Sequence, residues 1–389
     1  MKTRKKIVIT ALSCIVLGTL AYFAFVFPFY EFAVNDYDTS LDKILSLDYL
    51  KTLMPLFIII GLSAVGIVLI IWLRDLMLKK DKTYSRFAGR DKTGKAPKQK
   101  PVPFMIIRWT VMIVFSVLMI WGGLIFGLRM SSISIPILSC PWNTEQMTES
   151  SCYYLSHLNE LFELPIKSIL LFVGSTLLFI ILLGRVICGF LCPMGLIQDI
   201  MDKIRQKTKT EGISANEKLY SALTPIKWAM LLIFIGLCFI GGNFCNFCPA
   251  VAVSPILAGM STSLYVSGFL MIFVLIGGFF KRRLFCNICP LGYIIGLFHK
   301  VSLFRIKKDC TACTECGACY EACPMGIRQI YTERGKADVT DANCIMCGEC
   351  IKCCPEDKAL TLTCAGVKLY TSSRKEIMSG YKARTGEEK

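Results

Sequence analysis

Residues 313–324 read Cys313-Thr-Glu-Cys316-Gly-Ala-Cys319-Tyr-Glu-Ala-Cys323-Pro324, and residues 344–355 read Cys344-Ile-Met-Cys347-Gly-Glu-Cys350-Ile-Lys-Cys-Cys354-Pro355. Each stretch has the spacing in which three nearby thiolates hold one [4Fe-4S] cluster and the fourth cysteine reaches a second cluster. The pattern therefore predicts two clusters. Their expected ligands are Cys313, Cys316, Cys319 and Cys354 for cluster 1, and Cys344, Cys347, Cys350 and Cys323 for cluster 2.

Zinc and disulfides are the alternatives for such a cysteine pattern. Zinc sites use separated pairs of ligands rather than two evenly spaced quartets that each end in Cys-Pro. Two further cysteines, Cys310 and Cys353, fall outside the chosen register. We interpret both as buried thiols or as neighbours of a cluster.

Long apolar stretches make up much of the remaining chain, which is 54% hydrophobic and has a positive mean hydropathy. Runs of about 18 to 25 apolar residues are typical of membrane-spanning helices. The sequence predicts about six spans, at 7–29, 53–73, 104–127, 166–184, 226–243 and 264–280. The expected fold is a polytopic α-helical membrane protein with a C-terminal α+β ferredoxin domain of the bacterial two-[4Fe-4S] type.

The distribution of basic residues predicts the orientation of these spans. The segment 74–108, between the second and third spans, is rich in Lys and Arg, whereas the segments 31–52 and 128–165 carry acidic residues and few cations. Basic loops favour the cytoplasmic side. We expect a multi-pass protein of the cytoplasmic (inner) membrane, with the N-terminus and the ferredoxin domain in the cytoplasm.

The net charge of +16 could also indicate nucleic-acid binding. Because the cations flank predicted spans, where the positive-inside bias accounts for them, no nucleic-acid partner is expected. The lipid bilayer and its anionic head groups are the expected partners of the 79–101 loop.

Two further Cys-Pro motifs lie at the predicted cytoplasmic ends of helices. Their cysteines are Cys188 and Cys192 in the first motif, and Cys286 and Cys289 in the second. Four thiolates could converge there and bind an additional iron-sulfur centre, with Arg185 and Arg283 offsetting its negative charge. The alternative is that these are small apolar cysteines in tight helix turns.

A second set of four cysteines falls on the predicted outer side. It comprises Cys140, Cys152, Cys245 and Cys248. Outside the cytoplasm, two disulfides or a redox-active Cys-x2-Cys pair compete with a metal centre, and both interpretations stay open.

The sequence lacks the residues and motifs that other redox and hydrolytic chemistries require. The only two histidines, His157 and His299, lie near helix ends, which argues against haem within the spans. The sequence has no Gly-x-Gly-x-x-Gly fingerprint, no Gly-Lys-Ser/Thr phosphate loop and no Ser/His/Asp arrangement. Electron movement is the expected chemistry, and no catalytic residue is predicted.

The motifs Gly184-Arg-x2-Cys188-Gly-x2-Cys192-Pro-x-Gly and Arg283-x2-Cys286-x2-Cys289-Pro-x-Gly, followed by two ferredoxin motifs, resemble those of the membrane-bound polyferredoxins. That family includes the quinol-dehydrogenase subunit of periplasmic nitrate reduction and relatives in nitrous-oxide reductase and cytochrome oxidase maturation. The resemblance covers residues 100–365 and implies electron transfer between the quinone pool and a partner across the membrane. The chain departs from the pattern in its two additional N-terminal spans, in the Cys-x2-Cys spacing of its last membrane motif and in the pair Cys245 and Cys248.

The expected function is iron-sulfur electron transfer that links a cytoplasmic donor or the quinone pool to an acceptor at or across the membrane. The alternatives are a maturation or reductase factor that supplies electrons to a metal or disulfide on the outer face, and a redox-sensing subunit. Any enzymatic role would be that of a quinol-linked oxidoreductase subunit with a redox protein partner. The expected divisions are 1–103 (two spans and a basic loop), 104–305 (four-span core), 306–366 (ferredoxin domain) and 367–389 (polar tail).

Overall fold

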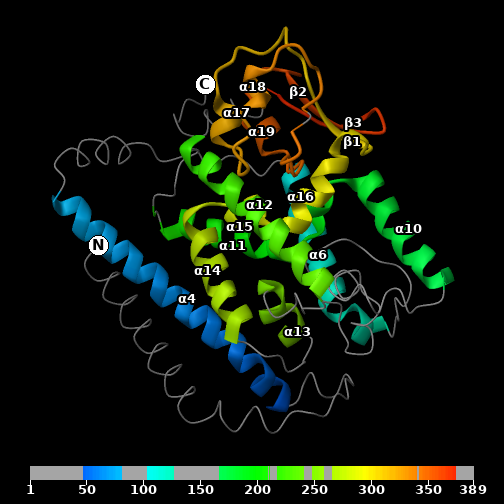
Figure 1. The fold of residues 1–389 in the computed structure, drawn as a ribbon. Coiled ribbons are helices and arrows are strands. Elements are labelled where there is room, and N and C mark those ends of the chain that lie inside the picture. Colours follow the sequence, from blue (N-terminus) through cyan, green and yellow to red (C-terminus); the bar gives the residue numbers. More distant parts are fainter. Residues whose placement is uncertain are drawn as a thin grey trace.

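The computed structural model describes residues 47–80, 103–126, 166–208, 210, 217–240, 248–257, 265–339 and 341–373. In these ranges the chain forms a set of long helices with a small α+β domain seated at one end of them (Figure 1). The cysteine motifs of the helical part pack against the core of the small domain at this junction.

Long helices occur at five of the six ranges in which spans are predicted. They are α4 (Leu47–Lys80), α6 (Pro103–Phe126), α10 (Ile166–Leu183), α12 (Glu217–Ile240) and α14 (Tyr265–Phe280). The predicted span 7–29 lies outside the described residues. Within the described residues, α4 alone is long and apolar enough to cross a membrane, over Met54–Trp72, and shorter apolar runs lie at Pro103–Leu118, Ile169–Leu183 and Ser267–Phe280. The six-span arrangement therefore stays a prediction.

Short elements surround the two Cys-Pro motifs of the helical part. The first motif forms the π-helical turn η1 (Ile187–Leu191) and then α11 (Pro193–Thr208). The second forms α15 (Leu284–Ile288), α16 (Pro290–Leu297) and the short η4 (Phe298–Lys300). Two further short helices, η3 (Pro249–Ala252) and α13 (Ser254–Leu257), pack against α14 and α4 respectively.

The small domain contains a three-stranded antiparallel sheet in the order β1-β2-β3. The strands are β1 (Phe304–Lys308), β2 (Leu360–Cys364) and β3 (Val367–Thr371), and the helices are α17 (Ala318–Glu321), α18 (Gln329–Thr332) and α19 (Glu349–Lys352). The predicted boundary at 366 is wrong, because β3 pairs with β2 and belongs to this domain. Ala365 and Gly366 both have positive φ, 48° and 87°, and form the tight hairpin turn that joins the two strands.

Cysteines form much of the core of the small domain. Cys319, Cys323, Cys344, Cys347 and Cys350 are buried together with apolar side chains from the sheet. This core continues into the helical part, where Phe104 of α6 stacks on Tyr370 of β3 with ring centroids 4.5 Å apart. The small domain is thus packed directly on the helices.

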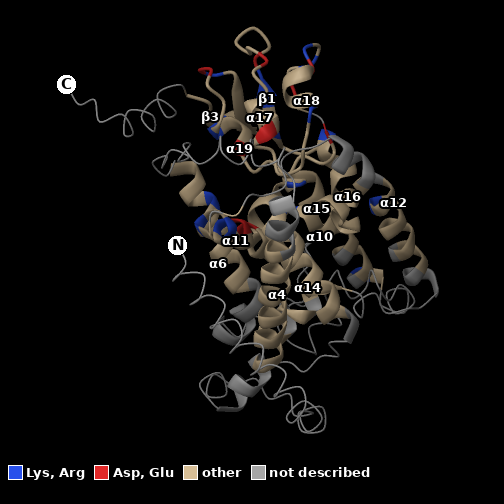
Figure 2. Cartoon of the chain, turned by 90° about the vertical axis from the view of Figure 1, so that its left-hand side faces the viewer, with Lys and Arg blue, Asp and Glu red and all other residues tan. Residues whose placement is uncertain are grey.

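The described charged residues lie mostly in the small domain and at its junction with the helices (Figure 2). The helices instead expose large apolar side chains, among them Leu170 (67%), Leu232 (67%) and Phe269 (69%). Apolar surface of this extent on several helices is unusual for a protein that is surrounded by water.

Candidate metal centres

Among the described residues, three cavities are each lined by four cysteines. The first lies in the small domain, measures about 350 Å³ and is lined by Cys313, Cys316, Cys319 and Cys354. These are the four residues predicted to hold cluster 1, including Cys354 from the distant second motif. Burial, together with the neighbouring Cys354, raises the pKa of Cys319 to about 12. Cys316 is exposed, so this quartet reaches the molecular surface.

The second cavity measures about 280 Å³ and is lined by Cys323, Cys344, Cys347 and Cys350, the predicted ligands of cluster 2. All four cysteines are buried. Burial raises the pKa of Cys323 to about 11, and the Ile327 N–H donates to its sulfur at 3.5 Å. The structure therefore brings together both predicted quartets, each with its crossed fourth cysteine.

The third cavity lies among the helices, measures about 390 Å³ and is lined by Cys188, Cys192, Cys286 and Cys289. It is larger than either cavity of the small domain. Burial raises the pKa of Cys192 to about 12, so a thiolate here needs a positive partner. The four cysteines at the predicted inner face thus converge in the structure, and Arg185 lines the same cavity.

The Cys-Pro-x-Gly sequence explains how each half of the third cavity is built. Cys192 and Cys289 have similar extended conformations, with φ and ψ of −70° and 119° for the first and −63° and 120° for the second. The proline that follows each cysteine starts a helix, where its missing N–H has no cost. The Gly292 N–H then donates to the Cys289 sulfur at 3.4 Å. Each motif therefore aims the N-terminus of a helix at a thiol, which favours its ionised form.

The first motif has one residue more between its cysteines than the second. The chain accommodates it in the π-helical turn η1, a geometry that is frequent at functional sites. A Cβ atom on Gly189, within this turn, would overlap the Ile345 carbonyl oxygen, so only glycine permits the approach of the two backbones. Ile345 belongs to the second quartet's loop, and η1 therefore connects the second and third cavities.

Gln198 is a neighbour of the third cavity that the sequence analysis missed. Its side-chain nitrogen donates to the Cys286 sulfur at 3.5 Å, and its oxygen accepts from the Phe285 N–H at 3.0 Å. The available signal was the polar face of α11, on which Gln198, Asp199 and Asp202 are all buried. Buried polar residues on a helix indicate specific partners.

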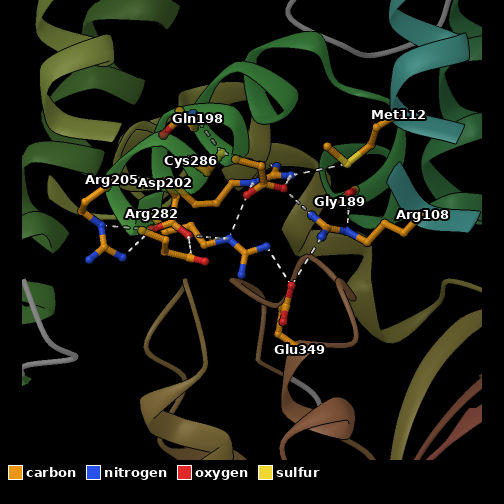
Figure 3. Close-up of polar contacts among 12 residues, drawn as sticks. Arg108, Met112, Gly189, Gln198, Asp202, Arg205, Arg282, Cys286 and Glu349 are labelled. Carbon is orange, nitrogen blue, oxygen red and sulfur yellow. Dashed lines mark hydrogen bonds and ion pairs between the residues drawn. The ribbon is translucent and has the colours of Figure 1, made fainter. Parts of the chain in front are cut away.

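A buried ion network lies beside the third cavity and links the helices to the small domain (Figure 3). Asp199 accepts from Arg108 at 2.6 Å, from Arg282 at 2.9 Å and from Arg283 at 2.7 Å. Although burial alone would raise it, Arg282 and Arg283 hold the pKa of Asp199 well below its usual range. Arg282 also donates to Glu349 at 2.9 Å, and Glu349 directly precedes Cys350 in the sequence. The network therefore joins α11 of the first Cys-Pro motif, the residues before α15 in the second, and the start of α19 beside the second quartet.

Of the predicted outer foursome only Cys248 lies in the described residues, so this set stays a prediction. Cys248 is buried, with 6% exposure, in a cluster that includes residues of α14, whereas Cys140, Cys152 and Cys245 lie outside the described residues. Of the two extra cysteines, Cys353 donates to the carbonyl oxygens of Ala318 and Cys350, each at 3.3 Å. Cys310 lies 4.0 Å from the Lys336 carbonyl oxygen.

The donor sets fit a cysteine-ligated cluster better than a single ion. In the described part of the chain, no three Cys, His, Asp or Glu side chains close on a point that suits one metal ion. Each quartet instead surrounds a hollow, and thiolates are the donors that [4Fe-4S] clusters use. A bound cluster would supply the positive iron that these buried sulfurs require.

Two families of iron-sulfur domain match the chain. The family described as a 4Fe-4S binding domain matches residues 166–211 and 263–309, which contain the four cysteines of the third cavity. The family described as a 4Fe-4S dicluster domain matches residues 312–360. These matches and the cysteine content show that the protein binds 4Fe-4S clusters.

Curated relatives match about two fifths of the chain. It is 31% identical over 185 residues to the uncharacterized protein MJ0750 of Methanocaldococcus jannaschii, which covers 46% of this chain and 71% of that protein. It is 30% identical over 156 residues to the methylamine utilization ferredoxin-type protein MauN of Paracoccus denitrificans, covering 39% and 53%. It is 23% identical over 156 residues to the putative electron transport protein YccM of Escherichia coli, covering 38% and 43%. The chain spans about half the length of the latter two relatives, and no solved structure matches it.

Proposed function

Because this chain belongs to the family of the Methanocaldococcus jannaschii protein MJ0750 and is an iron-sulfur electron-transfer protein, we propose that it carries electrons between its small domain and a helical core in the membrane. The eight cysteines of the first and second quartets hold two [4Fe-4S] clusters, and Cys188, Cys192, Cys286 and Cys289 hold a third centre. Each centre, when bound, supplies a site that takes up and releases one electron.

The contact between the second and third cavities is the observation that carries this proposal. A side chain on Gly189 would overlap the Ile345 carbonyl oxygen, and one on Gly296 would overlap that of Ala342. Arg185 also donates to the Ala342 carbonyl oxygen at 2.7 Å. Two glycines and one arginine thus bring the loop of the second quartet against the third, as a short electron path requires.

The exposure of the quartets supports an order along this path. Cys316 of the first quartet is exposed, whereas the second quartet is buried and faces the helices. Cys353 contacts Ala318 near the first quartet and Cys350 of the second, so those two also adjoin. A soluble redox protein would exchange electrons at the first quartet, and the second would relay them to the third.

The membrane part of the proposal is supported by the outward surface of the helices. Large apolar side chains are exposed on these helices, and the described charges lie mostly in the small domain and at its junction with the helices (Figure 2). Lipid is the solvent that such a surface suits. The bilayer is then a partner, with about six spans and a cytoplasmic small domain. A quinone dissolved in that bilayer is the proposed redox partner of the core, as in the polyferredoxins that the motifs resemble.

The test of the third centre is anaerobic iron and sulfide analysis with EPR spectroscopy on purified, reconstituted protein. We expect three reducible centres in the unmodified chain. Cys188→Ser and Cys286→Ser should each remove one and leave both ferredoxin signals. Cys364→Ser is the matched control, because Cys364 lies on β2 and lines none of the three cavities.

Two outcomes would count against the proposal. Iron for two centres only in the unmodified protein would remove the third centre, and loss of a ferredoxin signal in Cys188→Ser would mean that this cysteine acts through the small domain. The membrane orientation has a separate test. Green fluorescent protein fused after the last residue should fluoresce, and alkaline phosphatase fused there should be inactive, if the small domain is cytoplasmic; the reverse pair of results would invert the topology.

A further inference from the structure

In the third cavity, the arginine of each Cys-Pro motif packs against a glycine of the other motif. Each Cys-Pro motif has an arginine three residues before its first cysteine, Arg185 or Arg283, and a glycine three residues after its last, Gly195 or Gly292. A Cβ atom on Gly292 of the second motif would lie 2.9 Å from Nη2 of Arg185 in the first. A Cβ atom on Gly195 of the first motif would overlap Nη1 of Arg283 in the second. The glycine of each motif therefore provides the slot for the arginine of the other.

The two arginines differ in how their charge is compensated. Arg283 donates twice to Asp199, at 3.0 and 2.7 Å, and once to the Cys188 carbonyl oxygen at 2.6 Å. Arg283 therefore has a carboxylate partner, which it shares with Arg108 and Arg282, and its position is fixed. An added methyl group at Gly195 would meet a guanidinium that cannot move.

Arg185 has no such carboxylate within the described part of the chain. It is 1% exposed, its Nη1 donates to the Ala342 carbonyl oxygen, and its buried Nε has no hydrogen-bond partner among the described residues. It also lines the cavity of the four cysteines. A buried cation without an anion is costly, so the arrangement fits an anionic group in that cavity.

We propose that Gly292 holds Arg185 against the third cavity and that Arg185 sets the reduction potential of the centre bound there. The inference rests on the third centre of the proposed function and deepens it. Reduction adds one negative charge to a cysteine-ligated cluster, and a nearby cation in a poorly screened site favours that reduced form. Arg185 thus makes the third centre a better electron acceptor from the second quartet, and Gly292 is the residue that positions Arg185.

The test is an anaerobic redox titration of the full protein, followed by EPR spectroscopy. Arg185→Gln should lower the equilibrium constant for reduction of the third centre at least about tenfold, which is about 59 mV for a one-electron couple. Gly292→Ala keeps the arginine but displaces it, and should shift the potential in the same direction. Arg185→Lys should restore part of the shift. Gly174→Ala is the matched control, because a Cβ atom there meets nothing within 4 Å.

Each result decides the question. A third centre whose potential is unchanged in Arg185→Gln would overturn the role of the arginine and leave the proposed function standing. If the potential shifts in Arg185→Gln but not in Gly292→Ala, Gly292 does not position the arginine. Absence of any third signal from the unmodified protein would instead overturn the centre itself. The ferredoxin potentials should stay constant in all variants, and a common shift of all centres would contradict a local effect.

Discussion

Arg282, directly before the second Cys-Pro motif, donates a hydrogen bond of 2.9 Å to Glu349, the residue before Cys350 of the second quartet. Arg108 of α6 approaches the same carboxylate at 3.6 Å (Figure 3). Glu349 is therefore an anion of the small domain that two cations of the helices hold. This contact fixes the small domain in the orientation that the Gly189 and Ile345 backbones need.

Replacing Glu349 should weaken the attachment of the small domain. In Glu349→Gln the two arginines lose one carboxylate partner and keep Asp199, and we expect a loss of about 1 to 3 kcal/mol in the free energy of unfolding, with iron content unchanged. Denaturant unfolding of the purified protein measures this. Glu315→Gln is the control, since Glu315 pairs with Arg334 at an exposed position and should change the free energy by less than about 1 kcal/mol. Equal effects of the two variants would show that the buried pair has no special role.

The contribution of Glu349 should depend on pH in a defined direction. Burial alone would raise its pKa, but the charge of Arg282 holds it below the usual range. A carboxylate with a lowered folded-state pKa stabilises the fold above its unfolded pKa of about 4.3, and this is lost as the pH falls through the folded value. The stability difference between unmodified protein and Glu349→Gln should be constant from about pH 5.5 to 8 and shrink below about pH 4. Acid release of iron is common to both proteins. A difference that grows on acidification would contradict this sign.

Asp199 should be the most sensitive carboxylate of the junction. It is fully buried among Arg108, Arg282 and Arg283, so Asp199→Asn leaves Arg283 without a carboxylate and leaves Arg108 and Arg282 to share Glu349. We expect a loss of about 3 to 5 kcal/mol, read from thermal unfolding in detergent. Asp338→Asn removes a half-exposed pair with Arg305 and serves as control, with little change expected. A shift for Asp199→Asn no larger than the control would argue against a central role.

The cysteine quartets could be predicted from the sequence because their spacing is local. The crossed pairing of Cys354 with the first quartet and Cys323 with the second follows from one repeated motif. The meeting of Cys188 with Cys286 could be predicted because both motifs follow expected spans that run in the same direction, so both motifs were expected at the same membrane face. Their function as ligands stays a prediction, although the four cysteines of each set do line one cavity.

The ion network and the arginine slots could not be predicted in the same way. Arg283 meets Asp199 from a position 84 residues away, and Arg108 meets it from 91. No periodicity encodes such pairs, since they depend on how finished helices pack. Helix limits also differ from the apolar runs. Helix α12 starts at Glu217 rather than at 226, because backbone hydrogen bonds continue a helix through polar residues that a hydropathy pattern excludes.

The two ferredoxin-type quartets should differ in how fast they lose iron. Cys316 opens the first quartet to solvent, whereas all four cysteines of the second are buried. With a bulky, membrane-impermeant iron chelator, we expect the first cluster's EPR signal to decay at least about tenfold faster than the second, because release from the second requires local opening. Cys316→Ser should abolish the faster component alone. Decay of both signals at one rate would mean that the domain loses iron only by unfolding as a whole.

Gly189 should control electron transfer between the second and third quartets without holding iron itself. A methyl group at this position would overlap the Ile345 carbonyl oxygen, and backbone lies on both sides, so neither can yield without moving a loop. The Gly189 carbonyl oxygen is also held by Arg108 at 3.1 Å, which prevents the π-helical turn from retreating. In Gly189→Ala the loop of the second quartet must therefore move away from the third, while all twelve cysteines are retained as ligands. We expect unchanged iron content and an at least about tenfold slower appearance of the reduced third centre, because the rate of electron transfer falls steeply with distance.

Freeze-quench EPR with a reduced bacterial ferredoxin measures this rate, since that donor is too large to reach the third cavity directly. Gly236→Ala is the control, as a Cβ atom there meets nothing within 4 Å. If Gly189→Ala reduces its third centre as fast as the control does, electrons reach that centre by a route other than the Ile345 contact.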